Sequence, residues 1–324
     1  MTDIDSKTNL DGPDITGLIN DDVIQPFMLD QPDFRGRMVR LGPVMNEILA
    51  KHNYPKVIEQ LLVEAMTLTT LLGGMLKYKG VFTLQVKGEG AVSALSCDLS
   101  NDGVIRSFAL FDEEALEPFH PENTPTISTL LKKGYLALTV SPDNPDKKRY
   151  QGIVELEGET LRASVQHYFK QSEQIKTGMK FFSRLDGDEN WHAAAIMLQS
   201  LPFEEDKEHM QGVSNLKSDD WRRVMILLDT ATRKEMTDRD LPINDMILRL
   251  FHEETVRVFE PIQIRRGCRC SREKVATIIQ HNIPEDDLDT YRDENGDIFM
   301  VCEFCSERYD FTEAEIATLK NSEV

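Results

Sequence analysis

Apolar residues recur at helical intervals in the part of the chain before residue 80. Within 42–52 and 55–78 they fall three and four positions apart, which is typical of amphipathic helices. Pro55 stands where the second pattern begins, and proline suits the first position of a helix. Gly73 and Gly74 then either end this helix or let another backbone approach closely. The pattern therefore predicts two helices before residue 80.

Apolar and polar residues alternate in several segments after residue 80, and this period predicts half-buried strands. Turn sequences such as Gly88-Glu89-Gly90 and Asn101-Asp102-Gly103 separate the first of them, and a helical pattern over 161–171 interrupts the series. The predicted strands cover 82–86, a segment ending near Cys97, 104–111, 135–140, 152–156, 178–185 and 192–200. We therefore expect 22–202 to be an α+β domain with a mainly antiparallel sheet and packed helices.

Two segments beside this domain are too polar to contribute to a core. Residues 1–21 carry repeated Asp together with Gly12 and Pro13, and we expect a flexible tail. Residues 203–217, which follow Pro202, are polar and acidic, and we expect a flexible join there.

Two amphipathic helices are predicted between this join and residue 260. Ser218 can cap the first helix, and Pro242 begins the second. Their apolar faces include Trp221, Val224, Met225, Leu228, Ile247, Leu250 and Phe251. Because isolated short helices are unstable in water, these faces must dock on a neighbouring part of the protein. We expect 203–260 to be a helical linker.

The last 64 residues, 261–324, form a small unit with few large apolar side chains. Ser271 can cap a short helix, 293–296 form a hairpin turn before an alternating strand, and Thr312-Glu-Ala-Glu315 is a capping box. A unit of this size is marginally stable unless a disulfide or a metal supports it.

Four of the five cysteines provide such a support. Cys97 stands alone, whereas the others form Cys268-Arg-Cys270 and Cys302-Glu-Phe-Cys305. Brought together, four thiolates make a closed tetrahedral set suited to Zn²⁺. Zinc binding can contribute roughly 10–16 kcal/mol of folding free energy. The sequence therefore predicts one zinc ion in the C-terminal unit, while Cys97 is expected to be a small buried side chain.

The role of this zinc remains open among three readings. A catalytic zinc needs an open coordination position, which four cysteines do not leave. A nucleic-acid-binding ribbon should be basic, yet 262–324 contain eight Lys or Arg against fourteen Asp or Glu. The arginines Arg265, Arg266, Arg269 and Arg272 nevertheless cluster near the first cysteine pair. In the third reading, zinc is a structural lock that oxidation of the thiolates can open.

Composition narrows the choice of partners and compartment. Lys and Arg total 37 against 56 Asp and Glu, a net charge of −19, so neither nucleic acid nor an anionic membrane is an expected partner. No apolar run approaches the roughly 18 residues of a membrane span, and the first residues lack the apolar region of a signal peptide. A small, odd number of cysteines favours the reducing cytoplasm. No constellation of residues suggests an enzyme.

The free energies of zinc binding and of disulfide formation favour the third interpretation, in which zinc is a structural lock that oxidation opens. A disulfide between cysteines two or three residues apart closes a tiny loop, worth only roughly 2 kcal/mol. Two such disulfides cannot replace roughly 10–16 kcal/mol of zinc binding, and they leave the halves of the unit unconnected. If the linker helices dock against this unit, its oxidation would expose their seven apolar side chains, and exposed apolar surface marks protein-binding sites.

Several motifs resemble the redox-regulated holdase chaperones of the thirty-three-kilodalton heat-shock protein family. They are Gly267–Val275 with its two cysteines, then thirty-one residues between Cys270 and Cys302, and Cys302-Glu-Phe-Cys305. The segments 248–261, 149–158 and 168–174 are also similar to motifs of that family. The similarity covers about 22–318, with the motifs in the family's order.

The resemblance implies an N-terminal α+β domain, a metastable linker over 203–260 and a zinc-binding domain over 261–324. It implies that Cys268, Cys270, Cys302 and Cys305 bind zinc when reduced. Under oxidation it implies the disulfides Cys268–Cys270 and Cys302–Cys305, zinc release, linker unfolding and a homodimer that holds unfolded client proteins without ATP. The seven apolar linker residues are then candidates for client binding. The alternative is a constitutive zinc-stabilised adaptor or a nucleic-acid-associated protein.

Overall fold

The computed structural model describes residues 21–29, 34–74, 79–119, 125–173, 175–200, 210–294 and 296–321. Most of the predicted flexible tail, 1–20, lies outside these residues, as does 203–209 of the predicted join. From Met210 the chain is helical, so the expected flexible join is wrong for 210–217. Ser218 lies inside this helix and does not begin it.

Two sheets make up the larger part of the protein, and within the described residues each has six strands. The first sheet has the order β10-β1-β2-β9-β8, with β11 also paired to β1. Its strands are β1 (Val23–Leu29), β2 (Phe34–Leu41), β8 (Thr177–Leu185), β9 (Trp191–Ser200), β10 (Val256–Val258) and β11 (Ile262–Gln263). Every pair in this sheet is antiparallel.

The second sheet has the order β12-β5-β4-β3-β6-β7. Its strands are β3 (Gly80–Gly88), β4 (Val92–Ser100), β5 (Val104–Phe111), β6 (Gly134–Pro142), β7 (Tyr150–Glu155) and β12 (Arg265–Arg266). All pairs are antiparallel except β12 with β5, which is parallel. The predicted α+β class with mainly antiparallel pairing is confirmed.

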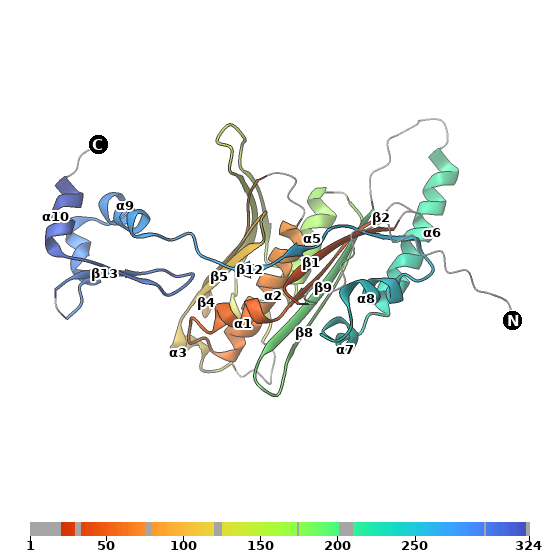
Figure 1. Ribbon diagram of the computed structural model, residues 1–324, viewed down its shortest axis with the longest axis horizontal. Coiled ribbons are helices and arrows are strands. Elements are labelled where there is room, and N and C mark those ends of the chain that lie inside the picture. Colours follow the sequence, from red (N-terminus) through yellow and green to blue (C-terminus); the bar gives the residue numbers. More distant parts are fainter. Residues whose placement is uncertain are drawn as a thin grey trace.

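Helix α2 (Lys56–Gly73) lies between the two sheets (Figure 1). It is apolar on nearly every side because both sheets cover it, and its buried residues share one core with β2, β4 and β5. The other helices beside this core are α1 (Pro43–Leu49), α3 (Glu113–Leu116), α4 (Ile127–Leu130) and α5 (Leu161–Tyr168), which continues into a π-helical turn at Phe169–Glu173.

The linker helices cover the opposite face of the first sheet. The two predicted helices correspond to α6 (Met210–Asp229) and α8 (Ile243–Leu250), and the short α7 (Arg233–Met236), which was not predicted, lies between them. In Figure 1 they form the teal group beside β8 and β9. A second apolar core joins them to side chains of β1, β2 and β9. The first sheet therefore lies between α2 and the linker.

The C-terminal unit extends away from the sheets (Figure 1) and has a small core of its own. It comprises α9 (Arg272–Asn282), a 3₁₀ helix (Glu285–Tyr291), β13 (Ile298–Val301), β14 (Arg308–Phe311) and α10 (Glu313–Asn321). The Ser271 side chain accepts a hydrogen bond from Lys274 N, as predicted. The predicted capping box is also present, since Thr312 N donates to Glu315 and Glu315 N to Thr312 Oγ1.

Three short strands connect the linker to this unit. β10 and β11 pair with β1 in the first sheet, and β12 then pairs with β5 in the second. Residues 256–266 therefore belong to the two sheets by strand pairing, on both sides of the boundary expected at 260. The proposed domain limits stay predictions. None of the helices in the described ranges has the length and apolarity that a bilayer span requires.

Candidate metal centre

The four C-terminal cysteines come from two turns of the chain. Cys268 and Cys270 lie between β12 and the N-terminus of α9. Cys302 and Cys305 bracket the turn between β13 and β14, which we call the knuckle (302–306). Cys305 N and Ser306 N both donate to Cys302 O, at 3.3 and 2.8 Å, and Ser306 has a φ of 57°. The hairpin thus presents both of its sulfurs on one side.

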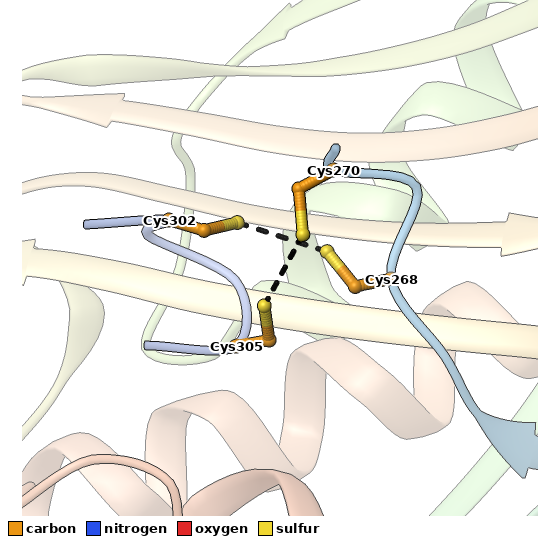
Figure 2. A group of neighbouring side chains, drawn as sticks. All are labelled: Cys268, Cys270, Cys302 and Cys305. Carbon is orange, nitrogen blue, oxygen red and sulfur yellow. Dashed lines mark hydrogen bonds between the residues drawn. The ribbon is translucent and has the colours of Figure 1, made fainter. Parts of the chain in front are cut away.

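The four sulfur atoms converge from these two turns (Figure 2). All lie within 4.8 Å of one another. The shortest contacts join the two motifs: Cys268 Sγ to Cys302 Sγ at 3.7 Å, and Cys270 Sγ to Cys305 Sγ at 3.5 Å. Four sulfur donors, with no carboxylate or imidazole in the group, fit a closed tetrahedral zinc site. The cluster can hold a metal ion.

The pKa values of three of these cysteines are shifted in different directions. Burial opposes ionisation of Cys268, but hydrogen bonds from the Cys270 backbone and from the neighbouring thiols outweigh it and lower its pKa to about 6. Burial is the main cause that raises the pKa of Cys302 and of Cys305, and the Cys268 sulfur adds to the rise at both. The Tyr309 hydroxyl donates to Cys270 Sγ at 3.1 Å. A divalent cation would stabilise the thiolate at every ligand and so lower the pKa of each cysteine, which allows all four sulfurs to be ionised together.

Cys97 lies apart from this cluster. Its side chain is buried in β4 within the core between the sheets. Burial raises the pKa of its thiol to about 12. It therefore has the environment of a small apolar side chain.

The seven candidate client-binding residues lie together on the first sheet. Trp221 and Met225 are half-buried, and the other five are buried. The ring of Trp221 meets Phe34 edge-on at 5.4 Å, and Phe251 lies 5.7 Å from Phe27. From the sequence we considered the case in which these faces dock against the C-terminal unit. In the structure they dock on the first sheet instead. The sheet is the only neighbour long and apolar enough to cover these faces in the described parts of the chain.

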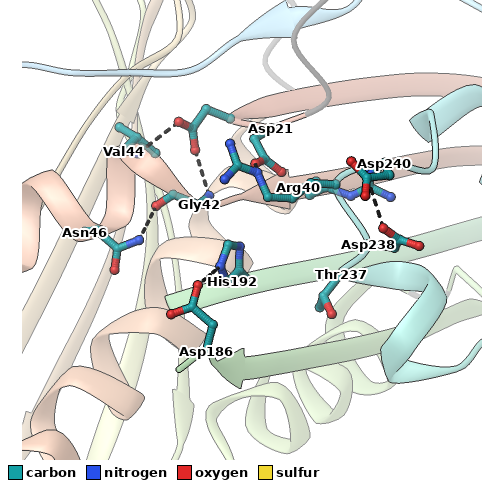
Figure 3. Close-up of polar contacts among 12 residues, drawn as sticks. Asp21, Arg40, Gly42, Val44, Asn46, Asp186, His192, Thr237, Asp238 and Asp240 are labelled. Atoms are coloured by element: carbon teal, nitrogen blue, oxygen red, sulfur yellow. Dashed lines mark hydrogen bonds and ion pairs between the residues drawn. The ribbon is translucent and has the colours of Figure 1, made fainter. Parts of the chain in front are cut away.

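Polar residues that the sequence did not single out also hold the linker. Arg40, buried in β2, donates to the backbone carbonyls of Met236 at 3.1 Å and Leu241 at 2.8 Å. Arg184 donates to Thr237 Oγ1 at 3.1 Å. Figure 3 shows Arg40 extended from the sheet toward the segment that carries Asp238 and Asp240. An arginine in a strand has no local feature that reveals such distant carbonyl partners.

Comparison with known proteins identifies close relatives. The family model described as "Hsp33 protein" matches residues 22–312. A 33 kDa chaperonin of Pseudomonas fluorescens is 38% identical over 306 residues, which cover 94% of this chain and 95% of that protein. A 33 kDa chaperonin of Escherichia coli is 32% identical over 301 residues, which cover 93% and 96%.

A solved structure has the same fold. It is the crystal structure of a 33 kDa chaperonin, a heat shock protein 33 homologue, from Thermotoga maritima. The TM-score is 0.76 at 20% sequence identity, and the match covers 92% of this chain and 97% of that one.

Proposed function

Because this chain belongs to the Hsp33 family, we propose that it is a molecular chaperone of the holdase type, switched on by oxidation of its four clustered cysteines. It would bind unfolding proteins in the cytoplasm without ATP and without an enzymatic step. The observation that carries the proposal is the convergence of Cys268, Cys270, Cys302 and Cys305 in a unit with a small core.

In the reduced state the four cysteines would hold one zinc ion. When bound, zinc supplies a tetrahedral cross-link between the turn before α9 and the β13–β14 hairpin. The apolar core of this unit, as far as it is described, has only seven buried residues. We expect its fold to depend on the cross-link.

Oxidation would remove the thiolates that bind zinc. We propose the pairs Cys268–Cys270 and Cys302–Cys305, which the family resemblance implies. For each pair, two thiolates lose two electrons as the S–S bond forms. Hydrogen peroxide accepts these electrons together with two protons from the solvent, its O–O bond breaks, and two waters leave. Since the shortest sulfur contacts join the two motifs, peptide mapping by mass spectrometry must distinguish this pairing from Cys268–Cys302 and Cys270–Cys305.

We propose that the linker is the part of the protein that changes its structure when the zinc unit is lost. Loss of the zinc unit would release β12 and then β10 and β11, the strands that lead back to α8. Undocking of 203–260 would expose the seven apolar side chains and the sheet face beneath them. We propose that this surface binds unfolded client proteins and supports a homodimer in the oxidised state.

The arginines near the first cysteine pair do not favour the nucleic-acid alternative. Arg265 pairs with Asp102, Arg266 with Glu47, and Arg269 with Asp98. Arg272 pairs with Glu315. Their charges are therefore neutralised within the chain, which leaves little for phosphate binding.

A light-scattering assay tests the proposal. Reduced, zinc-loaded protein and peroxide-oxidised protein are each mixed with a chemically unfolded client, and released zinc is measured in the same samples. We expect suppression of aggregation only after oxidation, with about one zinc released per chain. Equal suppression in both states would refute redox control, and no suppression in either state would refute the chaperone assignment and favour the adaptor reading.

A further inference from the structure

The knuckle lies on the face of the second sheet that points away from α2. Phe304, between Cys302 and Cys305, meets the ring of Phe108 edge-on at 4.7 Å. Ser306 Oγ donates to the backbone carbonyl of Lys51 at 2.8 Å. The C-terminal unit is therefore anchored to β5 and to the segment after α1 through the turn that carries two of its cysteines.

The first cysteine motif reaches the same face by strand pairing. β12 runs parallel to β5, and Gly267 N donates to Ile105 O at 3.2 Å. A Cβ at Gly267 would come within 2.6 Å of Val104 Cγ1, so the glycine permits this close approach. Cys268 follows directly.

Arg106 of β5 contacts both turns of the cluster. Its Cζ lies 3.8 Å from the centre of the Phe304 ring. Its Nη1 lies 3.9 Å from Cys268 Sγ. A guanidinium stacked on a ring in a partly buried site gains a cation–π attraction that depends strongly on distance. Arg106 can therefore hold the knuckle only while the Phe304 ring stays stacked on its guanidinium.

Asp98 fixes the orientation of this arginine. It lies opposite Arg106 on β4, is 6% exposed, and accepts from Arg106 Nε at 2.8 Å and Nη2 at 2.6 Å. Thr83 Oγ1 donates to Asp98 Oδ1 at 2.7 Å, whereas Arg269 donates at 2.6 Å to Oδ2, the oxygen that also accepts from Arg106. The guanidinium is thus held in place by the sheet before the knuckle arrives.

We propose that Arg106 is a positioning residue through which the second sheet senses the oxidation state of the cysteine cluster. While the four sulfurs are clustered, Arg106 holds the knuckle and β12 on the sheet. When Cys302 pairs with Cys305, the turn that carries Phe304 closes on itself, because a disulfide brings two sulfurs to about 2.05 Å. Phe304 then leaves Arg106, and the two-residue pairing of β12 loses one of its supports, the anchoring of the residues that follow it.

This inference rests on the proposed function and adds the route by which the signal leaves the zinc unit. β12 follows β10 and β11 in the chain, and these strands come directly after the last linker helix, α8. Release of the knuckle would therefore reach the linker along the backbone, with no contact required between the linker helices and the zinc unit.

The test compares wild type, Arg106→Ala, Arg106→Lys and a control, Arg308→Ala. Arg308 also stacks on a phenylalanine, with its Cζ 4.2 Å from the Phe299 ring, but this contact lies inside the C-terminal unit. In reduced, zinc-loaded protein, hydrogen exchange of the Gly267 amide is measured by NMR. The absorption spectrum of the cobalt-substituted protein reports the ligand set, and peroxide-driven zinc release is timed.

We expect Arg106→Ala to accelerate exchange of the Gly267 amide about tenfold or more, and to speed zinc release, with an unchanged cobalt spectrum. Arg106→Lys should restore part of the protection, since it keeps the charge and loses the planar stack. Arg308→Ala should leave Gly267 unaffected. Oxidised wild type should show the fast exchange of reduced Arg106→Ala.

Two outcomes would overturn the proposal: unchanged protection of Gly267 in Arg106→Ala, or retained protection in oxidised wild type. The light-scattering assay on the same samples separates this from failure of the chaperone proposal. Suppression of aggregation by oxidised protein with Gly267 still protected would refute only the Arg106 route. Loss of protection without any suppression would support the route and refute the chaperone assignment.

Discussion

Asp22 shows how a single buried side chain organises its surroundings. Its carboxylate accepts hydrogen bonds from Gly42 N at 2.8 Å and Val44 N at 2.9 Å, at the N-terminus of α1. Helix α1 has no side-chain cap of its own, so a residue preceding β1 supplies it. Burial raises the pKa of Asp22 to about 6, against these hydrogen bonds, and Asp21 and Glu47 add to the rise.

Asp22→Asn should therefore change how stability depends on pH. With a folded pKa near 6 and an unfolded pKa near 3.8, the contribution of Asp22 is complete below about pH 3.8 and is lost as pH rises toward 6. Asn does not titrate, so the variant should gain about 2 kcal/mol relative to wild type between pH 4 and pH 7. Urea unfolding followed by tryptophan fluorescence measures this.

Asp102→Asn is the matched control. The Ser100 hydroxyl and Arg265 lower the pKa of Asp102, so wild type gains from this group as pH rises. The difference should move in the opposite direction. A shift of the same sign in both variants would contradict the burial argument for Asp22.

Cys97 should take no part in the switch. Because its thiol is buried and its pKa is about 12, we expect it to stay reduced when the other four cysteines are oxidised. Cys97→Ala should cost about 1 kcal/mol of stability through a small cavity, with zinc content and zinc release unchanged. Thiol labelling after unfolding of the oxidised protein checks this, and a modified or disulfide-bonded Cys97 would be the contrary result.

At the scale of elements, α8 shows why the linker can respond. Its apolar side is buried on the first sheet, while polar residues such as Asp245 and Arg249 face outward. An eight-residue helix is unstable alone, so its structure depends on docking. We therefore expect α8 to lose its helical structure when its apolar face leaves the sheet and becomes exposed to water.

Ile247→Ala should weaken docking in the reduced protein. Ile247 is fully buried, and truncation of a buried isoleucine costs about 2–4 kcal/mol. We expect reduced, zinc-loaded variant to suppress client aggregation partially where wild type does not. Ile226→Ala, on α6 with its side chain 60% exposed, is the control and should behave as wild type. Equal behaviour of the two variants would show that docking does not restrain activity.

At the scale of the whole molecule, two cores of very different size share one chain. The core between the sheets unites α2 with strands of both sheets, whereas the C-terminal unit depends on its small cluster around Ile279 and Ile298. The cysteine cluster lies between the C-terminal unit and the outer face of the second sheet. Loss of the smaller core can therefore change the surface without unfolding the larger one.

Chelation of zinc from reduced protein should unfold the C-terminal unit and leave the larger core folded. We expect protease cleavage within 272–321 and retained resistance of the sheets, because the larger core needs no metal. Limited proteolysis with mass spectrometry checks this, and zinc replenishment is the control. A zinc-free protein whose C-terminal unit resists cleavage would contradict the metal-dependent fold.

The sequence was sufficient for features that depend on local spacing. The two cysteine motifs, the Ser271 cap, the Thr312 capping box and the start of α8 after Pro242 all appear as predicted. Strands β3 to β9 were largely predicted because alternation has a period that neighbouring residues reveal. Strands β1 and β2 were missed, since β2 is buried on both faces and carries arginines at positions that resemble a polar surface.

By itself the sequence determined the α+β class, the grouping of four cysteines as a possible metal site and the apolar faces of the linker helices. Only the tertiary structure decided that those faces dock on the first sheet, that Arg40 binds Leu241 across 201 residues, and that Arg106 lies beside Cys268. The physical reason is that helical period and metal-ligand spacing are set by adjacent residues. The partner of a buried charge or an apolar face is set by which distant segments the fold brings together.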